Sequence, residues 1–275
     1  MNRRRFLSLA AAAPLLRAAP FNKPLGINLY TVRDSLAKDP EKTYQALAAL
    51  GVTRIEVRPN HLQEHAALIR AAGLQPVHMF LDSAYFTGAR VQALAEMAGL
   101  AKQFGIRRLG VSYLMPAERA GAIPQLNKAV EHLGALGLGF YYHNHAWEFD
   151  ASAGPSFMER LRKEAHPDLR LELDLFWATI GGEDVIRMLG QWKGRVASLH
   201  VKDVAPDAPR QKTEANMPRS AFKEAGSGIL NWPRVLRASE DAGVEEYLIE
   251  QDFTPQDPIE SVRQSVAFLR RISAA

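Results

Sequence analysis

The most constraining feature of this 275-residue sequence is a regular alternation of short apolar, β-rich runs with longer amphipathic stretches. It begins at Leu25 and brings a new apolar run every roughly 20 to 40 residues. The predicted strands cover residues 25–30, 54–57, 75–80, 108–111, 139–142, 170–173, 196–199 and 247–249. Eight strand-then-helix units in about 250 residues match the count and length of an α/β (β/α)8 barrel, the TIM barrel.

Capping signals mark several of the intervening helices. Asp39-Pro40 predicts a helix that runs to Leu50, because an acidic cap followed by proline favours a helix start. Asp257-Pro258 predicts the last helix in the same way. Further helices are expected over residues 62–72, 91–104, 123–136, 156–164, 183–189 and 232–242. Residues 204–228 form a polar, proline-containing stretch that breaks the rhythm, and we interpret it as part of an active-site rim.

A doubly wound open sheet is the alternative fold. An open sheet would concentrate functional residues at one switch point between two strands. Here the polar candidates instead fall at the carboxyl ends of many predicted strands, where a barrel collects its active site; they are Glu56, His78, His143, Asp174, His200 and Glu250. No glycine-rich phosphate motif follows the first strand, and no domain boundary is visible. We therefore predict a single barrel domain over residues 20–275.

The first 19 residues resemble a twin-arginine export signal. Arg3-Arg4 forms the basic pair, Phe6-Leu7 follows it, and a short apolar run ends near small residues at Ala18-Ala19. The run is too short to span a bilayer permanently, so we expect no stable membrane insertion. Residues 1–19 thus predict a periplasmic or otherwise exported protein; a basic tail or a short helix is the alternative.

Charge and cysteine content limit the classes of partner and ligand. Residues 1–19 hold four arginines and no acid, so the remainder carries 30 basic and 30 acidic side chains and a formal charge of zero. A nucleic-acid-binding protein would need a basic face, and net neutrality argues against one. Cysteine is absent from the sequence, so any metal ion must be held by imidazole, carboxylate or water.

The segment from Tyr141 to Phe149 carries the densest chemistry in the chain. Two imidazoles, an amide and a carboxylate follow an apolar strand within six residues: His143, His145, Asn144 and Glu148. On a strand, His143 and His145 would face the same side. Glu148 is interpreted as a metal ligand, as a group that orients an imidazole, or as a surface residue.

Three later strands each end on one further ligand-type residue. Asp174 follows Leu171-Glu172-Leu173, and a carboxylate at the end of a buried strand needs a cation or several hydrogen-bond donors. Capping the next turn is the alternative for Asp174, and a hydrogen-bonded core position is the alternative for His200. Glu250 ends the last strand, where it could also take a proton from a carbon beside a carbonyl.

Other residues near these strand ends are candidate substrate contacts. Lys202 and Asp203 directly follow His200 and could reach the same site, with Lys202 as a charge for a substrate oxygen. The alternative for both is an exposed turn. Trp177 could stack on a face of the substrate, with buried packing as the alternative. Glu56 and His78, at the ends of the second and third strands, are expected to contact the same substrate.

With these blocks in place, the stretch from Leu25 to about Arg270 resembles the sugar phosphate isomerase/epimerase family of xylose isomerase-like barrels. The matching blocks lie in order along the chain: residues 142–149, 172–177, 198–203, 226–233 and 249–252. The first of them holds the pattern His143-Asn144-His145 followed by Glu148-Phe149. The resemblance implies a metal-dependent barrel enzyme that acts on a small carbohydrate substrate; the oligomeric state, including a homo-oligomer, stays open.

In epimerase-like members of that family, one divalent ion is held by Glu, Asp, His and Glu from strands five to eight. Asp174, His200 and Glu250 match three of these ligands, and His143 stands where relatives have the strand-five glutamate. The implied function is a sugar isomerase or epimerase that works through a metal-stabilised enediolate. We expect manganese first, with zinc, cobalt or magnesium as alternatives, because a mixed nitrogen and oxygen set does not select among them.

The histidine at position 143 leaves other chemistries open. Only Glu250 of the family's two proton-transferring glutamates is present, so Glu148 or His145 would have to serve as the second base. Relatives that cleave 3-oxo-glycosides are thought to use a histidine at the position of His145, so a lyase or hydratase is the main alternative. A DNA-repair endonuclease, with more histidine ligands and a basic face, and a catalytically dead sugar-binding barrel are two further alternatives.

Overall fold

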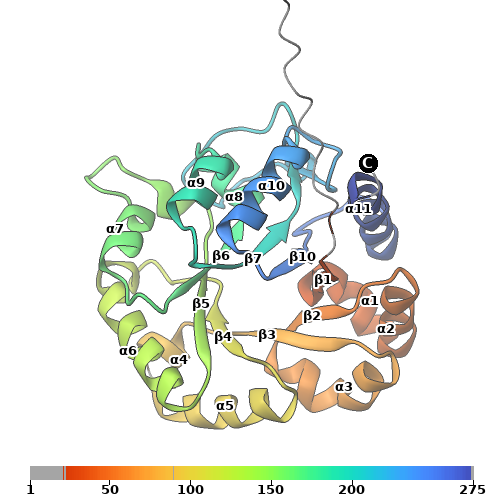
Figure 1. Ribbon diagram of the computed structural model, residues 1–275, viewed down its shortest axis with the longest axis horizontal. Coiled ribbons are helices and arrows are strands. Elements are labelled where there is room, and N and C mark those ends of the chain that lie inside the picture. Colours follow the sequence, from red (N-terminus) through yellow and green to blue (C-terminus); the bar gives the residue numbers. More distant parts are fainter. Residues whose placement is uncertain (1–20, 22, 89, 274–275) are drawn as a thin grey trace, which may run out of the picture.

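The computed structural model describes residues 21, 23–88 and 90–273. This part of the chain contains a closed barrel of eight parallel strands in the order β1-β10-β7-β6-β5-β4-β3-β2 (Figure 1). The strands are β1 Leu25–Asn28, β2 Arg54–Val57, β3 Gln75–Leu81, β4 Arg108–Val111, β5 Gly139–His143, β6 Arg170–Asp174, β7 Val196–Val201 and β10 Glu246–Ile249. Pairing of β1 with both β10 and β2 closes the barrel, which confirms the predicted fold and excludes the open sheet. The predicted export signal at residues 1–19 lies outside the described residues.

Helices surround the barrel and cover its outer face (Figure 1). They are α1 Arg33–Lys38, α2 Pro40–Ala49, α3 Pro59–Ala71, α4 Ala84–Thr87, α5 Leu94–Gln103, α6 Ala122–Ala135, α7 Phe157–Glu164, α8 Leu175–Ile180, α9 Val185–Gln191, α10 Trp232–Ala242 and α11 Pro258–Ser273. The last helix, α11, packs against α2, so the two ends of the ring of helices meet. No helix among the described residues is both long and apolar enough to cross a membrane.

Capping side chains explain where several helices begin, and the predicted caps at Asp39 and Asp257 are among them. The Asp39 side chain accepts a hydrogen bond from the backbone N–H of Lys42, and Pro40 occupies the first turn of α2. Ser156 and Asn231 cap α7 and α10 in the same way. These side chains satisfy backbone donors that the first turn of a helix leaves unpaired.

The structure differs from the sequence prediction near the first strand. The expected strand over residues 25–30 ends at Asn28, because the Asn28 side chain accepts a hydrogen bond from the backbone N–H of Tyr30 and starts a 3-10 turn over Leu29–Val32. Tyr30 is consequently 45% exposed. The helix expected over residues 62–72 begins three residues earlier, at Pro59, whose ring suits the first helical turn.

The segment expected as a loop over residues 204–228 contains a short antiparallel pair, β8 Asp203–Val204 with β9 Phe222–Lys223. Two-residue strands carry no periodicity, so the sequence did not predict them. This segment packs against the barrel through a small apolar cluster. In that cluster the ring centroids of Phe176 and Phe222 lie 4.3 Å apart in a stacked arrangement. The main core lies between the strands and the surrounding helices.

Candidate metal centre

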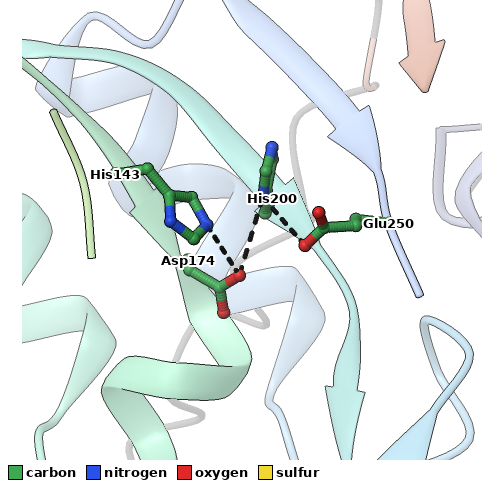
Figure 2. A group of neighbouring side chains, drawn as sticks. All are labelled: His143, Asp174, His200 and Glu250. Carbon is green, nitrogen blue, oxygen red and sulfur yellow. Dashed lines mark hydrogen bonds and ion pairs between the residues drawn. The ribbon is translucent and has the colours of Figure 1, made fainter. Parts of the chain in front are cut away.

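Four strand ends place their side chains at one point above the barrel (Figure 2). His143 ends β5, Asp174 ends β6, His200 lies near the end of β7 and Glu250 follows β10. Each offers one ligand atom, and these four atoms lie within 4.8 Å of one another in a buried site. Asp174 and His200 are direct neighbours in the register of β6 and β7. The structure therefore brings together the four residues that were predicted from sequence as metal ligands.

Local hydrogen bonds fix the orientation of Asp174. The Asn144 side chain accepts a hydrogen bond from the backbone N–H of Asp174 at 3.0 Å and ties the end of β5 to β6. Asp174 Oδ1 accepts from the backbone N–H of Trp177 at 2.7 Å and caps α8. Its other oxygen, Oδ2, lies 3.2 Å from His143 Nε2. Asp174 thus fills both roles considered for it: one oxygen caps a helix and the other faces the cluster.

Lys202 places a buried positive charge beside this cluster. Its ammonium group is buried, lies 2.9 Å from Asp174 Oδ2 and also contacts the carboxylates of Glu250 and Asp252. Burial alone would lower the pKa of Lys202, but the three carboxylates outweigh it and raise that pKa well above its usual range. Likewise, burial would raise the pKa of Glu250, yet His200 and Lys202 hold it well below the usual range. Both groups are therefore charged at neutral pH.

The donor set suits a divalent ion. Two imidazoles and two carboxylates converge without any thiolate, which is compatible with manganese, zinc, cobalt or magnesium. Two ionised carboxylates in a buried site require a cation nearby. His200 Nδ1 faces the cluster, 2.9 Å from Glu250 Oε2 and 3.6 Å from Asp174 Oδ2. These residues fit a divalent ion held by His143, Asp174, His200 and Glu250.

A second layer of polar side chains lies inside the barrel beneath the cluster. Alternation along a strand explains it, since residues two apart face the same side. Glu172, two residues before Asp174, accepts a hydrogen bond from the Ser198 hydroxyl at 2.6 Å, and Ser198 is two residues before His200. Glu56 and His78 complete this layer with Glu172, and all three side chains are buried. Glu172 was not among the functional residues expected from sequence, although strand alternation alone places it on the same face as Asp174.

His145 lies beside the cluster although β5 has already ended at His143. Their rings are 4.8 Å apart between centroids, so the two imidazoles are neighbours without the strand alternation expected for them. Burial lowers the pKa of His145 well below its usual range, and the neighbouring His143 adds to this effect. His145 is therefore neutral at pH 7 and able to accept a proton.

Glu148 is completely buried, which excludes a surface position for it. Its carboxyl group accepts hydrogen bonds from the Tyr142 hydroxyl at 2.7 Å and from the backbone N–H of His145 at 2.9 Å. Burial raises the pKa of Glu148 to about 8. The group is therefore neutral at pH 7, lies outside the cluster of four and supports the backbone that carries His145.

A cavity of about 540 Å³ opens above the cluster and reaches the surface. Its walls include His145, Glu250, Arg58, Tyr113 and the exposed ring of Tyr30. A volume of this size accommodates a small organic ligand. A further cavity of about 560 Å³ lies beside α1 and α2 and contains none of the four cluster residues.

Of the residues expected to contact a substrate, only Glu56 borders this cavity. His78 lies in the deeper layer, and its ring stacks against Tyr141 with centroids 4.6 Å apart. Trp177 is 4% exposed on α8 and packs against Phe222. Lys202 contacts the cluster from its buried side, so an exposed turn is excluded for this lysine.

Asp203 has a structural role that its neighbours in sequence did not indicate. Its buried carboxylate accepts hydrogen bonds from the backbone N–H groups of Gly226 at 3.1 Å and Leu230 at 3.0 Å. It also accepts one from the Trp232 indole N–H at 2.7 Å. These donors come from the far end of the loop after β8, so Asp203 holds that loop in place and does not reach the cavity.

Comparison with known proteins places the chain in a family. The sequence model of the xylose isomerase-like TIM barrel family matches residues 44–272. A sugar phosphate isomerase/epimerase from Parabacteroides distasonis superposes with a TM-score of 0.74, at 18% identity over 90% of this chain and 97% of that one. The zinc-containing IolI protein superposes with a TM-score of 0.66, at 16% identity over 90% of this chain and 98% of that one.

An inosose dehydratase from Geobacillus thermodenitrificans is 24% identical over 158 residues, which cover 54% of this chain and 52% of the dehydratase. The aligned region thus spans about half the length of that relative. The match to the family model covers most of the barrel, and the structural likeness extends over nearly all of it. The chain belongs to the xylose isomerase-like TIM barrel family.

Proposed function

We propose that this protein is a divalent-metal-dependent sugar isomerase or epimerase. The observation that carries the proposal is the convergence of His143, Asp174, His200 and Glu250 at the base of an open cavity. Three of them, His143, His200 and Glu250, also line that cavity. A substrate bound there would contact the same groups that hold the ion.

The ion, when bound, would polarise a substrate carbonyl and acidify the adjacent C–H group. Glu250 is the group placed to take that proton, because its carboxylate is ionised and borders the cavity. Lys202 and His200 hold Glu250 in this charged form and fix its position. Lys202 does not line the cavity and therefore has a supporting role.

Isomerisation or epimerisation also needs a group that returns the proton to a different atom or face. His145 is the best candidate, since it borders the cavity and its neutral imidazole can accept and then release a proton. Glu148 is a poorer candidate, because both of its oxygens are engaged and its carboxyl group is protonated at pH 7.

A 3-oxo-glycoside lyase or hydratase is the second candidate function. It is favoured by the histidine at position 143, which leaves this strand end without a carboxylate base. In that reaction Glu250 would remove a proton beside the keto group while the glycosidic oxygen departs. His145 would then have to be protonated when it donates to the leaving oxygen, so the two functions differ in the required charge of His145.

The test is incubation of the metal-loaded protein with ketoses and with 3-oxo-glucosides in deuterated water. Deuterium exchange at carbon without bond cleavage supports the isomerase or epimerase, and aglycone release supports the lyase. Glu250→Gln and His145→Gln should lose the reaction. Glu159→Gln, on the exposed surface of α7, should retain it. Sugar binding without exchange or cleavage, or a folded protein that takes up no metal, would contradict both functions.

We also propose that residues 1–19 direct export of the folded protein. Support comes from the Arg3-Arg4 pair and the short apolar run that follows it. Replacing both arginines with lysine should leave the protein in the cytoplasmic fraction, whereas the unchanged sequence should reach the periplasm. Equal distribution of the two forms would refute an export role.

A further inference from the structure

The two ring nitrogens of His200 face different environments. Nδ1 points toward the metal cluster and lies 2.9 Å from Glu250 Oε2. Nε2 points into the barrel and lies 2.8 Å from Glu56 Oε2 and 3.2 Å from Glu172 Oε2. The ring thus connects the cluster of four to the deeper polar layer. Which nitrogen carries a proton is set by the hydrogen bond of the other.

Glu56 is held rigidly in the position that receives His200. The Tyr141 hydroxyl donates to Glu56 Oε1 at 2.6 Å, and the Asn28 side-chain amide donates to Oε2 at 2.8 Å. Glu56 and Tyr141 are completely buried, and Asn28 is nearly so. With donors on both oxygens, the carboxylate cannot turn toward the ion or a substrate without breaking these bonds.

The deeper layer has the composition of a metal site, but its contacts indicate a different use. Both oxygens of Glu56 already accept hydrogen bonds, and Glu172 Oε1 accepts one from Ser198. A cation bound to Glu56, His78 and Glu172 would have to share the Glu56 oxygens with the Tyr141 and Asn28 donors. His200 Nε2 already lies 2.8 Å from Glu56 Oε2 and 3.2 Å from Glu172 Oε2, where such an ion would sit. The layer is therefore better suited to holding a ligand of the upper site than to binding an ion of its own.

We propose that Glu56 is a positioning residue that presents His200 Nδ1 to the metal ion by accepting a hydrogen bond from Nε2–H. This inference rests on the proposed metal site and gives Glu56 a role other than the substrate contact expected from sequence. Metal-bound histidines commonly donate their second N–H to a carboxylate, which fixes the tautomer and the ring orientation. Losing such a partner typically lowers metal affinity about 10- to 100-fold.

The first experiment measures zinc and manganese affinity of metal-free wild type, Glu56→Gln and Glu246→Gln by competition with a chromophoric chelator. Glutamine keeps the shape of the side chain but has one acceptor oxygen instead of two. Glu246→Gln is a matched control, because Glu246 is also buried but pairs with Arg54 at the opposite end of the barrel. We expect Glu56→Gln to bind each ion about 10- to 100-fold more weakly, and Glu246→Gln to bind like wild type.

A second measurement detects the hydrogen bond itself. Long-range proton–nitrogen NMR of the zinc-loaded, histidine-labelled wild type should show His200 protonated at Nε2 and bound to zinc at Nδ1. In Glu56→Gln the Nε2 proton should exchange faster with water. Tyr141→Phe keeps the charge of Glu56 but removes one of its hydrogen-bond donors. This variant should lose less metal affinity than Glu56→Gln, and it provides the test if Glu56→Gln does not fold.

The outcomes separate the two proposals. A folded wild type that binds no zinc or manganese would refute the metal-dependent function itself. A wild type that binds metal, with Glu56→Gln binding equally well, would refute only the positioning role. Equal weakening by Glu56→Gln and Glu246→Gln would also refute it, because the loss would then reflect general destabilisation.

Discussion

Glu148 offers a direct test of how burial controls charge in this barrel. The side chain is completely buried and its pKa is raised to about 8, whereas the ordinary value is 4.5. The change we consider is Glu148→Gln, which keeps the shape of the side chain and cannot ionise. The hydrogen bond from the backbone N–H of His145 can be retained by the amide oxygen.

The direction of the pH effect on stability follows from how many protons Glu148 binds in the folded and unfolded states. Above pH 4.5 the unfolded chain releases the Glu148 proton while the folded protein keeps it until about pH 8. Folding is therefore favoured most below pH 4.5, and this contribution is lost as the pH rises to about 8. The interval from 4.5 to about 8 is about 3.5 pH units, which at 1.36 kcal/mol per unit corresponds to about 5 kcal/mol.

The assay is chemical unfolding of wild type and Glu148→Gln at several values between pH 4.5 and pH 9. All other titrating groups are common to both proteins, so they cancel in the difference between the two free energies of unfolding. We expect this difference to move in favour of the variant by about 5 kcal/mol across that interval. A difference that changes by less than about 1 kcal/mol would show that Glu148 titrates normally and would refute the reasoning.

Three further predictions address the cluster and the barrel interior. Lys202→Met removes the cation among three carboxylates, so the free energy of unfolding measured without metal should fall by about 3–5 kcal/mol. Zinc should restore part of that loss. An equal loss with and without zinc would argue against a charge-balancing role for Lys202. Gly110→Ala should cost about 1–3 kcal/mol, because a β-carbon there would lie 2.3 Å from the Tyr141 ring, whereas Gly134→Ala on α6 meets no atom within 4 Å and should not destabilise. Zinc at about 100 times its dissociation constant should raise the free energy of unfolding by about 2.7 kcal/mol, and an unchanged midpoint after chelation would contradict a bound ion.

Much of the barrel could be predicted from local sequence. The eight apolar runs became the eight strands of the barrel, and the predicted caps at Asp39 and Asp257 mark observed helix starts. These features depend on hydrophobic periodicity and on side chains that bond to backbone within a few residues. The end of a strand can also be recognised from local sequence. For this reason His143, Asp174, His200 and Glu250 could be predicted together as metal ligands.

Other roles depend on contacts between distant segments. Glu56 was expected to contact a substrate, but its carboxylate bonds with Asn28, Tyr141 and His200 from three other strands. Asp203 was expected at the cavity, yet it binds the far end of the loop after β8. A sequence shows that such a residue is polar and near a strand end, but it does not show which donors surround it.

The order of strands and helices, the barrel and the end of it at which polar residues gather could all be predicted from the amino-acid sequence. Those outcomes follow from period-two and helical patterns, which each segment carries independently. The division of the interior into an upper layer that faces the cavity and a lower layer that supports it depends on contacts between distant strands. The reason is that barrel closure sets the distance between side chains far apart in sequence, such as the 2.8 Å between Glu56 Oε2 and His200 Nε2, which are 144 residues apart.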